Sequence, residues 1–299
     1  MPPEADGARK GDETSEGMEI RAADVMALRE RTGAGMMDCK KALGEAAGDL
    51  EKAEDWLRLK GMKAADKKAG RATGEGRVQA AIAADGRSGG MIAVCCETDF
   101  AAGTEHFQEL LDRLCAHVSE QKPDTVEDML EQHLVGTDET VGATIRAAVG
   151  KLGENLSLAD AVCLENPEGL VGAYIHHNRK IGVLVSVKTS AAREDAQAHL
   201  KALGMHVAFT NPAALKRDDI PAEALERETA IYRQEVRGKP AEIQDRIVQG
   251  KLSKFFAQQA LVEQAWVKDD ALTVAQAVRS LLGEEAEITA FARFAISGA

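Results

Sequence analysis

Hydrophobic residues in the segment 19–60 recur three and four positions apart, the spacing that places side chains on one face of an α-helix. Three such stripes follow one another, and turns containing glycine separate them. They comprise Val25 and Leu28, then Met36, Cys39 and Leu43, then Leu50, Ala53 and Leu57. We therefore predict a small N-terminal domain of three short helices, with Asp49 as the N-cap of the third and only marginal stability in isolation.

From residue 77 onward, short apolar runs alternate with longer helical stripes, which predicts a mixed fold. Paired strands are expected at 78–83 with 91–96, and at 171–176 with 181–187. Helices are expected at 104–119, 125–134, 137–152 and 191–208, and a strand or short helix at 155–164. Because a hairpin followed by helices occurs twice, we predict an α+β fold with two similarly built α/β subdomains of antiparallel strands, 78–168 and 169–299.

Two further elements are expected within the second subdomain. Narrow apolar stripes on both sides of Gly238-Lys239-Pro240 predict a protruding antiparallel helical hairpin, a coiled coil, at 222–262. The segment 287–296 alternates and predicts a strand. Its apolar residues are expected to share one face: Ile288, Ala290, Ala292, Phe294 and Ile296.

The composition narrows the possible classes of function. The 299 residues carry a formal net charge of −12, so general electrostatic binding to nucleic acid is not expected. Residues 1–18 hold five acidic and two basic side chains and no apolar segment, which is typical of a disordered tail. Five cysteines without a Cys-x-x-Cys pair indicate reduced thiols in a cytoplasmic protein. No run approaches 18 apolar residues, so no membrane span is expected.

The segment 58–77 holds seven basic and two acidic side chains, interrupted by four glycines. It is interpreted either as a surface for RNA or another acidic partner, or as a solvated, flexible linker. It has no aromatic residue that could stack on a base, which weakens the RNA interpretation. We predict a flexible basic linker at 61–77. A scaffold that binds RNA or an acidic partner through 58–77 is kept as the alternative function.

The sequence contains few arrangements of side chains that are suited to catalysis. The pairs His176-His177 and Cys95-Cys96 are adjacent on predicted strands, where neighbouring side chains point to opposite faces and do not readily share a metal ion. The sequence has no Gly-x-x-x-x-Gly-Lys motif, and no Gly-x-Gly-x-x-Gly motif between a strand and a helix. We expect no cofactor, no metal site and no nucleotide site.

The stretch Cys95-Cys96-Glu97-Thr98-Asp99-Phe100-Ala101-Ala102 closes the apolar run at 91–94. An acidic and a large aromatic residue stand side by side where a strand ends, and a strand is a rigid base for presenting side chains. Two positions are open for Phe100. It either turns back into the core, as most aromatic residues at strand ends do, or it faces solvent for binding.

Two stretches resemble signatures of bacterial elongation factor Ts. The first is a long, nearly unbroken match, Leu28-Arg29-Glu30-Arg31-Thr32-Gly33-Ala34-Gly35-Met36-Met37-Asp38-Cys39-Lys40-Lys41-Ala42-Leu43. The second is Thr98-Asp99-Phe100, which follows in the order typical of that family. The resemblance extends over residues 19–296.

The resemblance implies a UBA-like domain at 19–60 and a partner, elongation factor Tu, bound in its GDP-bound and nucleotide-free states as a 1:1 or a 2:2 complex. It implies exchange of GDP for GTP without a covalent step, so the chain would not be an enzyme. Thr98, Asp99, Phe100 and Ala101 would form the contact that displaces magnesium, with Asp99 and Phe100 entering the partner's GTPase domain beside the magnesium site.

Other residues are carried over by position. Met36 and Met37 match an apolar contact with the partner. If one of them is instead a core residue, we expect it to be Met36, because it shares the stripe of Cys39. His176 matches a histidine that reaches toward the partner's phosphate loop. Ala101 stands where the family often has valine. The family's C-terminal helix after the last strand does not occur before Ala299, so we expect that contact to be missing.

Overall fold

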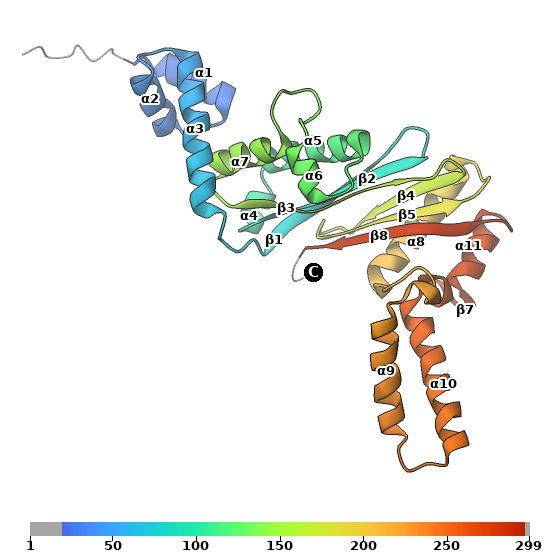
Figure 1. Ribbon diagram of the computed structural model, residues 1–299. Helices are drawn as coiled ribbons and strands as arrows, with labels where there is room; N and C mark the ends of the chain where they lie inside the picture. Colours follow the sequence, from blue (N-terminus) through green and yellow to red (C-terminus); the bar gives the residue numbers. More distant parts are fainter. Residues whose placement is uncertain (1–19, 297–299) are drawn as a thin grey trace, which may run out of the picture.

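The computed structural model describes residues 20–296, so the predicted tail at 1–18 lies outside the described part. Figure 1 shows three parts along the molecule: a helical bundle at one end, two adjoining sheets with covering helices in the middle, and a long helical hairpin that points away at the other end. The predicted α+β class is confirmed.

The N-terminal bundle consists of α1 (Ala22–Thr32), α2 (Met36–Glu45) and α3 (Leu50–Lys68). Its core contains the stripes expected from the sequence with the exception of Met36, and Leu28, Cys39 and Leu43 are fully buried. Asp49 is the N-cap of α3, as predicted, and its carboxylate accepts hydrogen bonds from the backbone of Glu51 and Lys52.

The prediction of a flexible linker at 61–77 is wrong for its first half, because α3 continues to Lys68 and packs on the middle part of the molecule. Ala65 is buried among the residues around the first sheet. Gly61 lies against Gly150 so closely that a Cβ on Gly150 would stand 2.6 Å from the Cα of Gly61. This contact is made by small residues. Because they form no stripe of large apolar side chains, the sequence pattern does not predict it. Only residues 69–74 connect α3 to the first strand.

Replacing Gly150 by alanine is expected to force α3 away from α7 (Val141–Leu152), at a cost of about 1–3 kcal/mol, as for other overpacked contacts. In limited trypsin digestion, Lys60 and Lys63 should be cut slowly in the unaltered protein and faster in Gly150→Ala. Gly61→Ala is the control, because its Cβ would meet Gly150 at an ordinary 3.5 Å. Rapid cleavage of the unaltered protein at Lys60 would show that α3 is not docked.

The first sheet has the antiparallel order β1-β2-β3, with β1 (Glu75–Ile82), β2 (Ser88–Cys96) and β3 (Leu156–Glu165). The segment 155–164, for which the sequence allowed either a strand or a short helix, is therefore a strand. Helices α5 (Glu105–Gln121), α6 (Val126–Glu131) and α7 pack on one face, where Phe107, Leu111 and Leu114 are fully buried.

The second sheet repeats this arrangement with the order β4-β5-β8, from β4 (Gly169–Ile175), β5 (Ile181–Lys188) and β8 (Glu287–Ala295). Helices α8 (Arg193–Thr210) and α11 (Val274–Leu282) cover it, beside a small ribbon of β6 (Ala265–Trp266) and β7 (Asp269–Thr273). The uncovered faces of the two sheets meet in one apolar layer that includes Met91, Val171 and Leu184.

Both third strands, β3 and β8, contain a bulge at the corresponding position of the ladder. The extra residue of β3 lies opposite the step from Ala93 to Val94 of β2, and that of β8 lies opposite the step from Ser186 to Val187 of β5. The bulge in β8 reverses the direction of the side chains that follow it. Ile288 consequently packs on the helix side, whereas Phe294 packs between the sheets. The prediction that all apolar residues of 287–296 share one face is therefore wrong.

The covering helices also repeat a buried polar contact. In α5, His117 Nε2 lies 2.9 Å from Gln132 Oε1, and the backbone N–H of Val135 donates to Nδ1 at 3.3 Å. In α8, His206 makes the same two contacts with Gln264 and Val267, at 2.8 and 3.3 Å. A backbone N–H can only donate, so Nδ1 accepts in both rings and the ring proton on Nε2 faces the glutamine oxygen.

Burial lowers the pKa of His206 below its usual value. As the pH falls below about 6.5, the unfolded chain takes up a proton that the folded chain refuses, so stability should decrease with acidification. The expected slope is up to about 1.4 kcal/mol per pH unit for this one group. Urea unfolding between pH 7.5 and 5 should show a smaller slope for His206→Gln, and an unchanged slope for the exposed control His177→Gln. Equal slopes in all three proteins would contradict the assignment.

The helical hairpin comprises α9 (Ala222–Glu235) and α10 (Ala241–Gln259) and extends from the second sheet (Figure 1). Among residues 222–259, only Val236, which follows α9, and Val248 of α10 are buried. The predicted limit at residue 262 is too late, because Ala260 and Leu261 have no exposed surface and the 3-10 turn Leu261–Glu263 belongs to the core of the second sheet. A second 3-10 turn, Arg217–Asp219, precedes the hairpin.

Removing residues 226–254 and joining the ends with a short glycine linker should leave the thermal transition of the rest of the protein intact. Removing 222–262 should cost at least about 2 kcal/mol, because it deletes the buried Leu261. Thermal melting of both shortened proteins tests this boundary. If both melt alike, the core does not depend on the segment after Gln259.

Candidate functional site

The motif at the end of β2 forms a four-residue helix, α4 (Asp99–Ala102), that holds Phe100 out in solvent. Phe100 is 85% exposed, which excludes the interpretation that it turns into the core. Ala101 and Ala102 are buried and attach α4 to the core, so Ala101 is a poor direct contact for a partner. Thr98 caps α4, with its hydroxyl oxygen accepting from the backbone of Ala101 at 3.2 Å.

The turn that carries His176 lies beside this motif. Lys180 Nζ is 2.8 Å from the Glu75 carboxylate, and Glu75 is the strand partner of Cys96. His176 is half-buried, and its Nδ1 is 2.8 Å from the hydroxyl of Tyr174. The structure thus brings the β4–β5 turn to the end of β2 that leads into α4.

Met36 and Met37 begin α2 and are 48% and 75% exposed. The expectation that Met36 is a core residue is therefore wrong, because the first turn of α2 extends beyond the three-helix core. The preceding turn lies on α5: a Cβ on Gly33 would stand 3.0 Å from the ring of His106, just after α4. The turn before the methionines thus lies on α5 and the turn of His176 is tied to β1, and both α5 and β1 contact α4.

Comparison with known proteins decides the family. The family model described as "Elongation factor TS" matches residues 97–298. Elongation factor Ts of Trichlorobacter lovleyi is 41% identical over 289 residues, covering 93% of each chain. That of Aquifex aeolicus is 39% identical over 289 residues, 94% of this chain and 99% of its own, and that of Clostridium kluyveri is 40% identical over 281 residues, 92% of each.

The chain belongs to the elongation factor Ts family. It is a translation elongation factor that acts as a guanine-nucleotide exchange factor for elongation factor Tu. The resemblance found in the two sequence signatures is thereby confirmed.

The alternative function, a scaffold that binds RNA through 58–77, is not supported. Four of the basic side chains are engaged within the protein: Arg58 with Glu139 at 2.9 Å, Lys60 with Asp38 at 2.5 Å, Lys68 with the Gly153 carbonyl at 2.5 Å, and Arg71 with Glu97 at 3.4 Å. Arg58 and Lys68 join α3 to the middle part of the molecule, and Lys60 joins α3 to α2 within the bundle, which accounts for part of the basic composition.

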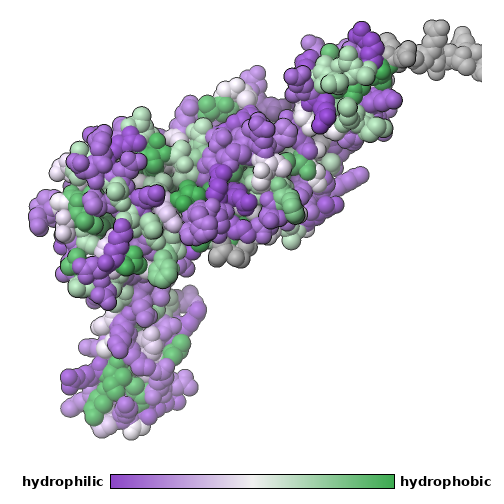
Figure 2. Space-filling model, turned by 180° about the vertical axis from the view of Figure 1, so that it is seen from behind, coloured by the Kyte–Doolittle hydropathy of each residue, from purple (hydrophilic) through white to green (hydrophobic). Residues whose placement is uncertain are grey.

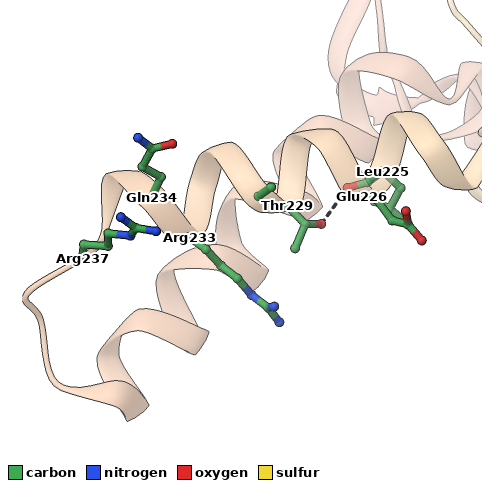
Figure 3. Close-up of a pocket in the computed structure, with 7 residues that line it drawn as sticks. Leu225, Glu226, Thr229, Arg233, Gln234 and Arg237 are labelled. Carbon is green, nitrogen blue, oxygen red and sulfur yellow. Dashed lines mark hydrogen bonds between the residues drawn. The ribbon is translucent and has the colours of Figure 1, made fainter.

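Other candidate chemistry is not supported within residues 20–296. No group of three His, Cys, Asp or Glu residues there could hold a metal ion, and no helix there has the length and composition to cross a membrane. Cys95 and Cys96 are buried, and burial raises the pKa of the Cys96 thiol to about 11, so it is a poor nucleophile. Figure 3 shows a groove along α9, where the Thr229 hydroxyl donates a hydrogen bond to the Leu225 carbonyl. The side chains of Arg233 and Arg237 diverge there and do not enclose a ligand site.

The sequence reasoning missed exposed apolar side chains on α8. Phe209 is 84% exposed and Met205 44% exposed. The available signal was their position off the stripe of Leu200, Leu203 and Val207, which is buried. The rear surface in Figure 2 is mostly hydrophilic, with small scattered hydrophobic areas.

Proposed function

We propose that α4 acts as a wedge in the exchange reaction. Phe100 enters the GTPase domain of elongation factor Tu beside the magnesium site, Asp99 accompanies it, and Thr98 and Ala101 hold the helix. The observation that carries this proposal is the exposed position of Phe100 on a short helix anchored by buried neighbours. Aromatic side chains, phenylalanine among them, are enriched in binding interfaces relative to the rest of the protein surface.

The wedge would act by weakening the hold on magnesium. Magnesium bridges the protein and the phosphates of the nucleotide, so its displacement lowers the affinity for GDP. Linkage then requires that GDP and magnesium weaken the binding of the exchange factor by the same ratio. GTP binds the emptied site afterwards.

Met36, Met37 and His176 would supply further contacts. Both methionines are exposed apolar side chains at the start of α2, and His176 lies in the turn tied to Glu75. In this proposal the bundle is a UBA-like domain, the α9–α10 hairpin is a coiled coil, and the two sheets with their helices are separate subdomains, 78–168 and 169–299.

In this proposal the protein forms a 1:1 or a 2:2 complex with GDP-bound or nucleotide-free elongation factor Tu in the cytoplasm. It catalyses no covalent step, needs no cofactor and makes no direct contact with nucleic acid. The charge of −12 agrees with a protein partner in preference to RNA.

The test is release of a fluorescent GDP from elongation factor Tu, followed by stopped flow with increasing concentrations of this protein. The rate should rise with concentration, and excess magnesium should reduce the stimulation. An increase in rate that is independent of magnesium would contradict displacement of the metal. Sedimentation of the complex distinguishes the two stoichiometries.

A further inference from the structure

Glu154 lies in the turn between α7 and β3 and contacts Thr98, the N-cap of the proposed wedge helix α4. Its Oε2 accepts a hydrogen bond from the backbone N–H of Thr98 at 3.0 Å, and its Oε1 accepts from the Thr98 hydroxyl at 2.6 Å. Hydrogen bonds to an ionised carboxylate are stronger than those between neutral groups. Glu154 is half-buried and both of its oxygens accept hydrogen bonds from Thr98, so it faces the protein and not a partner.

The Thr98 hydroxyl links this contact to α4. It donates to Glu154 and accepts from the backbone N–H of Ala101, so the carboxylate orients the group that caps the helix. A helix of four residues is too short to be stable by itself. The direction of Phe100 therefore depends on the cap and on what fixes the cap.

A second carboxylate completes the arrangement. Glu97 accepts from the backbone N–H of Asn155 at 2.7 Å, and the pKa of Glu97 is lowered first by that bond and then by Arg71. The side-chain amide of Asn155 donates a hydrogen bond through Nδ2 to the backbone carbonyl of Arg71 at 2.9 Å. The end of β2, the turn after α7 and the segment after α3 are thus joined at one point.

We propose that Glu154 is a positioning residue for Phe100, which holds α4 in the orientation that enters the partner. This inference rests on the proposed wedge function. Without Glu154, α4 would sample several orientations, of which only a fraction binds. A binding-competent fraction of about one tenth raises the apparent KM about tenfold, while the maximal rate at saturation changes little.

The first experiment measures stimulated GDP release over a range of concentrations of Glu154→Ala. We expect KM to rise about tenfold with kcat nearly unchanged. Glu154→Gln keeps one carbonyl acceptor, so its effect should be smaller. The control is Glu165→Ala, which removes the partner of Lys122, 2.5 Å away, at the other end of β3. It should leave KM unchanged.

The second experiment reads the wedge without the partner. Amide hydrogen exchange in the free protein should become faster at Ala101, Ala102 and Gly103 in Glu154→Ala, and stay as in the unaltered protein in Glu165→Ala. In the Thr98→Val background, Glu154→Ala should raise KM by a smaller factor, because the hydroxyl that it orients is already absent.

The outcomes separate this inference from the function on which it rests. If Phe100→Ala leaves GDP release unaffected, the wedge proposal fails. If Phe100→Ala abolishes release but Glu154→Ala changes neither KM nor the exchange of the α4 amides, only the role of Glu154 is overturned. Should Glu154→Ala not fold, an unchanged KM for Glu154→Gln, together with unchanged exchange of the α4 amides, overturns it equally.

Discussion

Replacing Phe100 by alanine should reduce stimulated GDP release roughly 30- to 1000-fold and leave the melting temperature of the free protein unchanged. The side chain is 85% exposed, so its removal opens no cavity in the folded chain. The loss falls on the complex, where truncation of an interface anchor costs about 2–4 kcal/mol. The measurements are stopped-flow release of fluorescent GDP from elongation factor Tu and thermal melting of the free variant.

Asp99 provides a graded comparison. Asp99→Ala should weaken exchange less, because its exposed carboxylate remains partly hydrated at the edge of an interface. The double variant should lose less than the sum of the two single effects, since neighbours that act as one unit are not additive. A large drop in the melting temperature of Phe100→Ala, with exchange recovered on cooling, would return Phe100 to a structural role.

Phe107→Ala should show the opposite behaviour, with a loss of about 3–5 kcal/mol of folding free energy. Phe107 has no exposed surface and lies in the cluster between α5 and the first sheet. Because this fold carries the wedge, exchange should fall only as far as the folded fraction falls. Urea unfolding measures the stability, and release assays at low temperature measure the exchange.

The two phenylalanines are matched controls, since they share a side chain and differ in burial. If Phe107→Ala is as stable as the unaltered protein, the cluster has repacked and the assigned core is wrong. If both variants lose exchange while remaining fully folded, the interface extends beyond α4.

The sequence by itself determined the elements whose signal lies in consecutive residues. The stripe of Cys39 and Leu43, the N-cap at Asp49 and the two stripes around Gly238 each depend on neighbours in the chain, so periodicity and turn chemistry predicted them. The family signatures are equally local, and they indicated the residues of the proposed wedge. Whether Phe100 pointed inward or outward stayed open, because a strand end permits either direction.

The tertiary structure decided everything that depends on segments far apart in the sequence. Gly61 packs closely against Gly150 because both residues lack a side chain. Helix α3 therefore continues through a segment that the sequence predicted to be a flexible linker. The bulge in β8 arises in its pairing with β5, which reversed the expected faces. Glu154 and Thr98 are 56 positions apart, and no local pattern reveals a contact that exists only after folding.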